Sequence, residues 1–108
     1  MPDLRAPRRI ACPIPGYTDV AVTLPAEWLG AHWLRRDEVE ALAEAQKIPF
    51  PRVCVALALA EDWENIPGAE VHDDPASWDV KRMPIPVLRW LVDVVYLDFV
   101  KAFDFPKV

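Results

Sequence analysis

The stretch "MPIPVLRWLVDVVYLDFVKAF", residues 83–103, is far more apolar than the surface of a small protein requires, and it decides the fold. Two prolines near its start suit the first turn of a helix, so we expect a helix from Ile85 to Phe103. At about 100° per residue Arg89, Asp93 and Tyr96 fall on one narrow polar stripe, where Arg89 and Asp93 have the i,i+4 spacing of an ion pair. The remaining apolar arc is much wider than the arc of about 100° on an ordinary surface helix. This width predicts a helix that is core on one side and a contact surface for a second chain on another.

The charges within this stretch argue against a membrane span, because a spanning helix needs about 20 residues nearly free of charge. Asp98 is the unusual one, since it projects opposite the polar stripe, among apolar side chains. Unpaired buried charges are rare. Asp98 therefore either meets water where the end of the helix emerges from the domain, or pairs with a cation on a partner chain or among the N-terminal arginines.

The size and charge of the chain narrow its class. Its 108 residues fit one domain, which we expect over residues 10–108, after an irregular arm at residues 1–9. The net charge of −5 argues against nucleic-acid binding, which needs clustered positive charge, and the only basic cluster lies in the arm. Cys12 and Cys54 have no zinc-site spacing, so we expect two free thiols in a reducing compartment.

The rest of the sequence predicts a mostly α domain with a minor N-terminal β element. Apolar residues alternate over residues 20–24, as in a half-buried strand, and residues 10–12 are its expected partner. Residues 61–79 carry many carboxylates and no lysine or arginine. Because Trp63 and Trp78 bracket this acidic segment, we expect it to be held against the body of the domain.

Two further segments have the composition of helices. Residues 25–46 contain the capping box of Asp37 and Glu40, which predicts a second helix start after a break near Arg35. Residues 51–63 are rich in alanine and favour another helix, although their alternating valines and leucines make a strand the competing interpretation.

No pattern in the sequence predicts catalysis. His32 has an arginine at i+4 where a second metal ligand would stand, and His72 adjoins two aspartates without the glycine spacing of a calcium loop. The glycines are isolated, and no hydroxyl or thiol residue lies in a nucleophile motif. We therefore expect no enzyme activity, no metal and no cofactor.

Five residues are the predicted protein-interaction residues. Tryptophan is enriched at interface hot spots, and Trp28, near a turn, is the tryptophan most expected at a contact surface. On the last helix the wide apolar arc adds Trp90, Phe99 and Phe103, and Asp98 is the charged residue expected beside them.

Three segments resemble, in order and spacing, small proteins encoded in the tail region of tailed bacteriophages, most of all the tail assembly chaperones: "VTLPAEWLGAHWLRRDEV", "VALALAEDWENIPG" and "PASWDVKRMPIPVLRWLVDVVYLDFVKAF". The resemblance covers about residues 17–107 and carries over no catalytic residue. It implies a non-enzymatic, mostly helical protein of the host bacterial cytoplasm. Such a protein binds the tape measure protein, or another tail protein, and keeps it soluble before the tail tube assembles.

Other classes remain open at this point. The chain could be a virion structural protein for head–tail joining or tail completion, or a regulatory module whose acidic residues 61–79 mimic nucleic acid. The wide apolar arc of the last helix also fits a homo-oligomer. No membrane and no nucleic-acid partner is expected.

Overall fold

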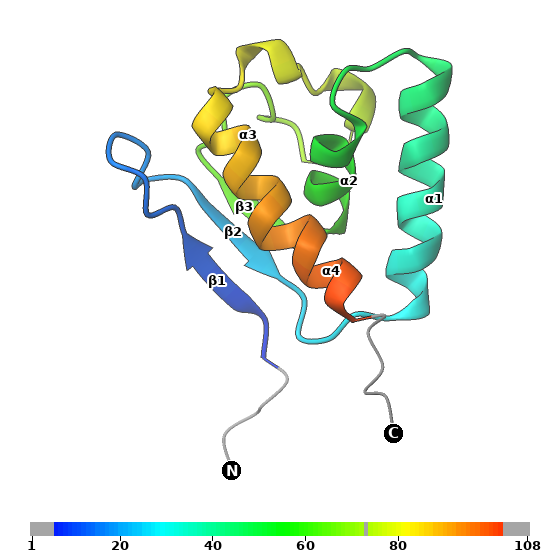
Figure 1. Ribbon diagram of the computed structural model, residues 1–108, viewed down its shortest axis with the longest axis horizontal. Helices are drawn as coiled ribbons and strands as arrows, with labels where there is room; N and C mark the ends of the chain where they lie inside the picture. The colour runs from blue at the N-terminus through cyan, green and yellow to red at the C-terminus, as the bar shows by residue number, and fades with distance from the viewer. Residues whose placement is uncertain (1–5, 73, 103–108) are drawn as a thin grey trace.

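The computed structural model describes residues 6–72 and 74–102, which fold into one antiparallel sheet covered by helices (Figure 1). The chain order is β1 (Arg8–Ala11), β2 (Ala21–Leu24), α1 (Gly30–Ala45), α2 (Pro51–Leu59), β3 (Asp62–Glu64), the 3-10 turns η1 (Pro75–Ser77) and η2 (Val80–Arg82), α3 (Ile85–Leu91), the π-helical turn η3 (Val92–Tyr96) and α4 (Leu97–Lys101). The last three elements follow one another without a break and form one long helix.

The sheet has β2 at its centre, with β1 and β3 antiparallel on either side. This confirms the predicted strand at residues 20–24 and its N-terminal partner. The prediction of irregular structure over residues 1–9 is wrong for Arg8 and Arg9, because both belong to β1. Arg9 is fixed there because its guanidinium donates to Glu64 of β3 at 2.7 Å, across the central strand. Residues 1–5 of the expected arm lie outside the described residues.

The helices differ from the prediction at three places. The first helix was expected over residues 25–46, but α1 begins only at Gly30, because Pro25 to Leu29 form the turn that leads from β2 into it. α1 is continuous through Arg35, so the expected break is wrong: Arg36 pairs with Asp37 at 3.0 Å and lies over the Trp33 ring, and these local contacts are compatible with one helix. α2 ends at Leu59, and the residues after it turn into β3 because Trp63 pairs with Val22 of β2. The described chain is therefore mixed, about half helix with a three-stranded sheet, and not mostly α.

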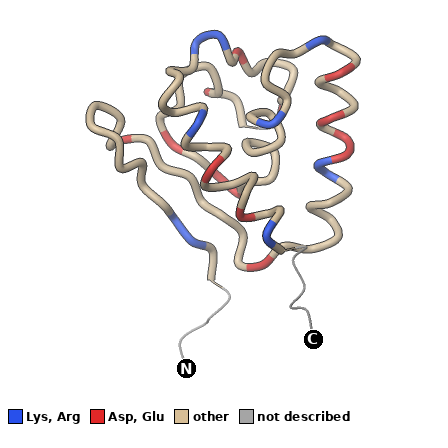
Figure 2. The backbone as a smooth tube through the Cα atoms, viewed as in Figure 1, with Lys and Arg blue, Asp and Glu red and all other residues tan. Residues whose placement is uncertain are grey.

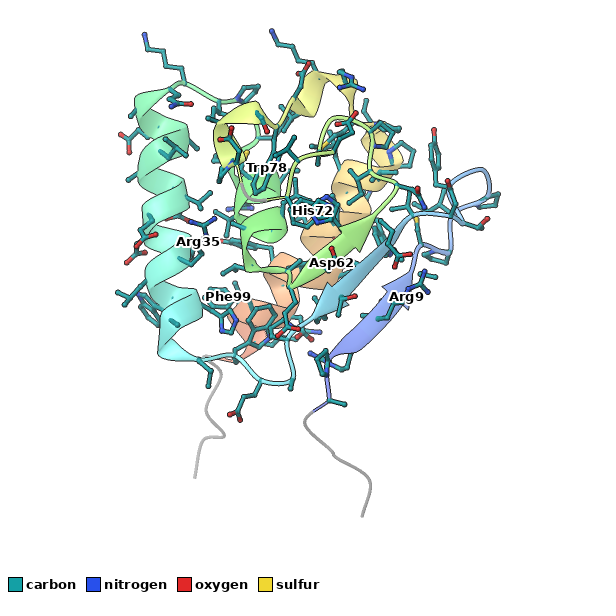
Figure 3. All side chains as sticks on the ribbon, turned by 180° about the vertical axis from the view of Figure 1, so that it is seen from behind. Arg9, Arg35, Asp62, His72, Trp78 and Phe99 are labelled. Carbon is teal, nitrogen blue, oxygen red and sulfur yellow. The ribbon has the colours of Figure 1, made fainter. Side chains whose placement is uncertain are left out.

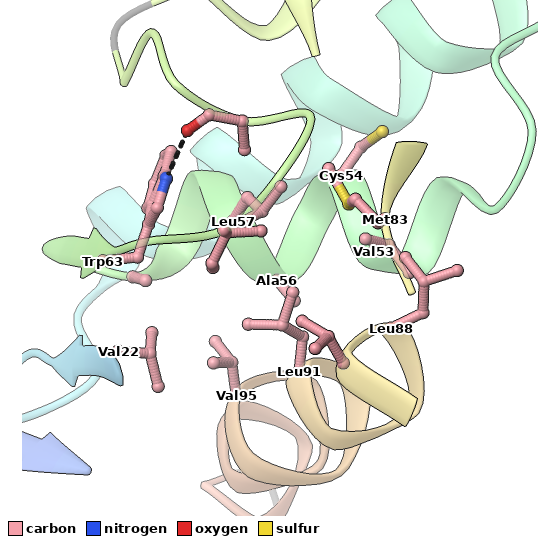
Figure 4. Close-up of a cluster of buried hydrophobic side chains, with 14 of the residues drawn as sticks. Val22, Val53, Cys54, Ala56, Leu57, Trp63, Met83, Leu88, Leu91 and Val95 are labelled. Carbon is pink, nitrogen blue, oxygen red and sulfur yellow. Dashed lines mark hydrogen bonds between the residues drawn. The ribbon is translucent and has the colours of Figure 1, made fainter. Parts of the chain in front are cut away.

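The core lies where α2 and the long C-terminal helix meet one face of the sheet (Figure 4). Its central side chains have no exposed surface: Val22, Ala56, Leu57, Leu91 and Val95. Burying side chains of this kind contributes about 1.5–3 kcal/mol each for valine and leucine, so this contact is the main source of stability. The predicted helix start at Ile85 is confirmed, and its first two turns bring Val87 and Leu91 into this core.

The acidic segment is held against the body, as predicted from its two tryptophans. The indole N–H of Trp63 donates to the carbonyl oxygen of Ala69 at 2.7 Å, and that of Trp78 donates to the carbonyl oxygen of Val71 at 2.7 Å. The two indoles meet edge to face, with ring centroids 5.5 Å apart. Both hydrogen bonds satisfy groups that would be costly to bury unpaired.

Candidate functional site

Two of the predicted interaction residues are core residues. Trp90 is 7% exposed and Phe99 is 1% exposed, so the prediction that they face a second chain is wrong for the described fold. The cause is that the domain covers more of the long helix than its sequence suggested. The Phe99 ring, for example, packs edge to face with the Trp28 ring, with the two ring centroids 5.3 Å apart. Phe103 lies outside the described residues.

Trp28 and Asp98 are joined to each other. The indole N–H of Trp28 donates to Oδ2 of Asp98 at 2.9 Å, and the guanidinium of Arg8 donates to the same oxygen at 3.1 Å. The sequence left open whether Asp98 meets water or pairs with a cation, and in the structure it pairs with the N-terminal Arg8. Both residues are part-buried and serve the fold, because this carboxylate links β1, the turn before α1 and α4.

The large exposed apolar side chains instead include two that face a hollow between the start of α2 and α3. Phe50 is 60% exposed and Ile85 is 78% exposed. Between them Val53, Leu88 and Val92 line a hollow of about 300 Å³, which we call the Phe50–Ile85 groove. Val53 and Leu88 are buried and form its floor, where α2 and α3 lie beside each other (Figure 4).

The position of Phe50 follows from its local sequence. It stands between Pro49 and Pro51, and Pro51 takes the first position of α2. Its backbone is left-handed, with φ 55° and ψ 60°, a conformation that costs a residue other than glycine about 1–2 kcal/mol. The chain therefore turns sharply into α2 with a large aromatic side chain left on the surface.

The charges around the groove are mostly basic. Arg52, Arg89 and Asp93 line a second hollow of about 430 Å³ that shares Phe50 and Val53 with the groove. Arg52 also lies over the ring of Tyr96, with its guanidinium carbon 5.6 Å from the ring centroid.

Arg89 was expected to pair with Asp93, but within the described residues no ion pair joins them. The π-helical turn η3 begins at Val92, between the two, and such a turn departs from the ordinary i,i+4 register. Arg89 is exposed and lines the hollows on both sides of α3, one of them with Ile14 and Trp90. Its guanidinium is thus exposed beside the Phe50–Ile85 groove.

The only aspartate–histidine pair among the described residues lies elsewhere. Nδ1 of His72 is 2.9 Å from Oδ1 of Asp62, and the His72 ring lies 4.3 Å from the Trp63 ring (Figure 3). Within the described part of the chain no group of three or more histidine, cysteine, aspartate or glutamate side chains could hold a metal ion. The pair links the loop after β3 back to β3 itself.

Two other carboxylates of the acidic segment pair with arginines of the same chain. Glu70 accepts from Arg82 at 2.6 Å, and hydrogen bonds from its own backbone and from Arg82 lower the pKa of Glu70. The hydrogen bond from Arg9 lowers the pKa of Glu64. Figure 2 shows further acidic positions along α1, along the long helix and in the loops between the elements.

The cysteines are both buried. Cys54 lies inside α2 as the sequence predicted, and burial raises the pKa of its thiol. A buried thiol with a raised pKa is a poor nucleophile, because the thiolate is the reactive form.

Sequence reasoning missed Phe50 altogether and placed Ile85 only as the start of a helix. The signal that could have found Phe50 was its place in Pro-Phe-Pro, since a phenylalanine between two prolines has no regular element to bury it.

In the structure as described, 6–72 and 74–102, no helix combines the length and hydropathy needed to cross a membrane.

Comparisons with family models, with curated proteins and with solved structures find no match to this chain.

Proposed function

We propose that this protein is a non-enzymatic tail assembly chaperone of a tailed bacteriophage, which binds an apolar helix of the tape measure protein in the Phe50–Ile85 groove. The observation that carries the binding role is the exposure of Phe50 and Ile85 on either side of an apolar hollow. Contiguous patches of exposed apolar side chains usually mark interaction sites. The choice of client, and of the host bacterial cytoplasm as the place of action, rests on the sequence resemblance.

A helix is the partner that best suits the shape of the groove. Its floor is formed by two neighbouring helices, α2 and α3, and a third amphipathic helix can place leucine-sized side chains into such a furrow at i, i+3 and i+7. The negative charge of the chain would limit self-association while the groove is empty.

The acidic regulatory module is less well supported. A nucleic-acid mimic needs carboxylates that are free to meet a partner, whereas Asp62 and Glu70 are engaged within the chain by His72 and Arg82. A virion structural role remains the competing proposal, and the two differ in whether mature particles contain the protein. Mass spectrometry of purified virions separates them, since a chaperone is absent from the particle.

Co-expression with the tape measure protein of the same phage tests the binding role. The wild-type chain should keep the tape measure protein in the soluble fraction, and Ile85→Asp should abolish this effect. Leu34→Asp is the matched control, because Leu34 is 65% exposed on α1, outside the groove. Equal loss in both variants, or no loss in Ile85→Asp, would overturn the proposed site.

A further inference from the structure

We infer that the helix bound in the Phe50–Ile85 groove carries a carboxylate that pairs with Arg89. This inference rests on the proposed function and specifies the chemistry of the partner. Arg89 lies on α3, four residues after Ile85, so a helix seated against Ile85 and Leu88 places its flanking side chains within reach of the guanidinium.

The argument for a carboxylate is one of charge complementarity. The chain as a whole is acidic, with a net charge of −5, yet two arginines and one aspartate line the hollows at this site. Arg8, Arg9, Arg35, Arg36 and Arg82 all have carboxylate partners within the chain. Arg89 has no ion pair among the described residues, and Asp93, its nearest acid in sequence, lines the same hollow without pairing with it.

Arg89 is also well suited to discriminate between partners. An arginine at the edge of an apolar groove attracts a carboxylate and repels a lysine or arginine, and such rim charges set specificity more than total affinity. A nucleic-acid phosphate offers the same charge, but it has no apolar surface to fill the space between Phe50 and Ile85. The apolar floor therefore favours a protein helix.

Two synthetic helical peptides test the inference. Both have 18 residues with leucines at i, i+3 and i+7; one carries glutamates and the other lysines beside the leucines. Binding to the full chain is measured by fluorescence anisotropy. The glutamate peptide should bind about tenfold more tightly than the lysine peptide, a difference typical of one well-placed charge pair. Arg89→Glu should reverse this preference, whereas Lys101→Glu, which changes the net charge equally on α4, should preserve it.

The possible results separate the inference from the proposed function. Equal binding of both peptides, or an unchanged preference in Arg89→Glu, overturns the role of Arg89; if Ile85→Asp still weakens both peptides, the groove itself stands. Failure of both peptides to bind contradicts the groove as a helix site and the inference with it. A single-stranded 20-nucleotide DNA that displaces the glutamate peptide through Arg89 would show that the site takes phosphate, and would also overturn the inference.

Discussion

The indole N–H of Trp28 reaches Asp98, 70 residues further along the chain, with a hydrogen bond of 2.9 Å. Arg8 of β1 donates to the same carboxylate oxygen, so one side chain at the start of α4 joins three segments that are far apart in sequence. Asp98, which looked out of place on an apolar face of the helix, thus has two hydrogen-bond partners, Trp28 and Arg8. Its charge is paired within the domain, so Asp98 is a structural residue.

Replacing Asp98 tests this junction. Asp98→Ala leaves the part-buried Trp28 indole without an acceptor and should lower the free energy of unfolding by about 1–3 kcal/mol. Asp98→Asn keeps an acceptor for Trp28 and loses only the ion pair with Arg8, so it should cost less than about 1 kcal/mol. Urea denaturation measures both. Equal costs for the two variants would show that the Trp28 hydrogen bond contributes little.

Phe99 should be a stability residue and not a binding residue. Because it is 1% exposed, Phe99→Ala should lower the free energy of unfolding by about 3–5 kcal/mol, the usual cost of such a cavity. Phe50→Ala, on the surface, should change the free energy of unfolding little, since an alanine keeps the left-handed backbone strain and loses little packing. Chemical denaturation followed by circular dichroism compares them. A small effect of Phe99→Ala would contradict its place in the core.

Gly68 should tolerate no side chain. It has φ +91°, and a Cβ there would meet the carbonyl oxygen of Asp79, so Gly68→Ala should cost about 3 kcal/mol or more. Gly16 has the same φ with open space around it, and Gly16→Ala should cost only about 1 kcal/mol. The difference between the two variants in thermal or urea unfolding isolates the steric contribution. Similar costs would mean that the loop before η1 yields to the added methyl group.

The Arg9–Glu64 pair should make stability depend on pH in the acid range. Since the pKa of Glu64 is lower in the folded state, its contribution is complete above the pKa of the unfolded chain and is lost as pH falls through the folded value. Glu64→Gln should therefore lower the unfolding midpoint at pH 7, and the difference from wild type should shrink toward pH 3. Arg9→Gln in the Glu64→Gln background is the control and should add little. A difference that is constant with pH would rule out the ion pair as its cause.

The parts of the fold that local sequence determines were predictable. The strand at residues 20–24 has a clear alternation, and the prolines near Ile85 suit one place to begin a helix. β3 could not be foreseen, because three residues are too few to show a period and their conformation depends on pairing with β2. The preceding alanine-rich run favoured a helix that in fact stops at Leu59.

For the candidate site, the sequence predicted that the last helix would carry excess apolar surface, but not which residues of it stay exposed. The apolar excess of the last helix correctly suggested burial, but a regular 100° wheel cannot anticipate a π-helical turn, and the pairing of Arg89 with Asp93 failed there. The sequence also does not say how much of the helix the domain covers: Trp90 and Phe99 became core, whereas Ile85 stayed exposed. Such coverage is set by tertiary packing, which helical periodicity alone does not encode.

The most direct test of the proposed client site is photo-cross-linking from the rim of the Phe50–Ile85 groove. A photoreactive phenylalanine analogue is placed at Ile85 or, as the matched exposed control, at Leu34, in cells that co-express the tape measure protein. We expect irradiation to join the position 85 variant to the tape measure protein and to leave the position 34 variant unlinked. Cross-links of equal yield from both positions, or from position 34 alone, would contradict the Phe50–Ile85 groove as the client site.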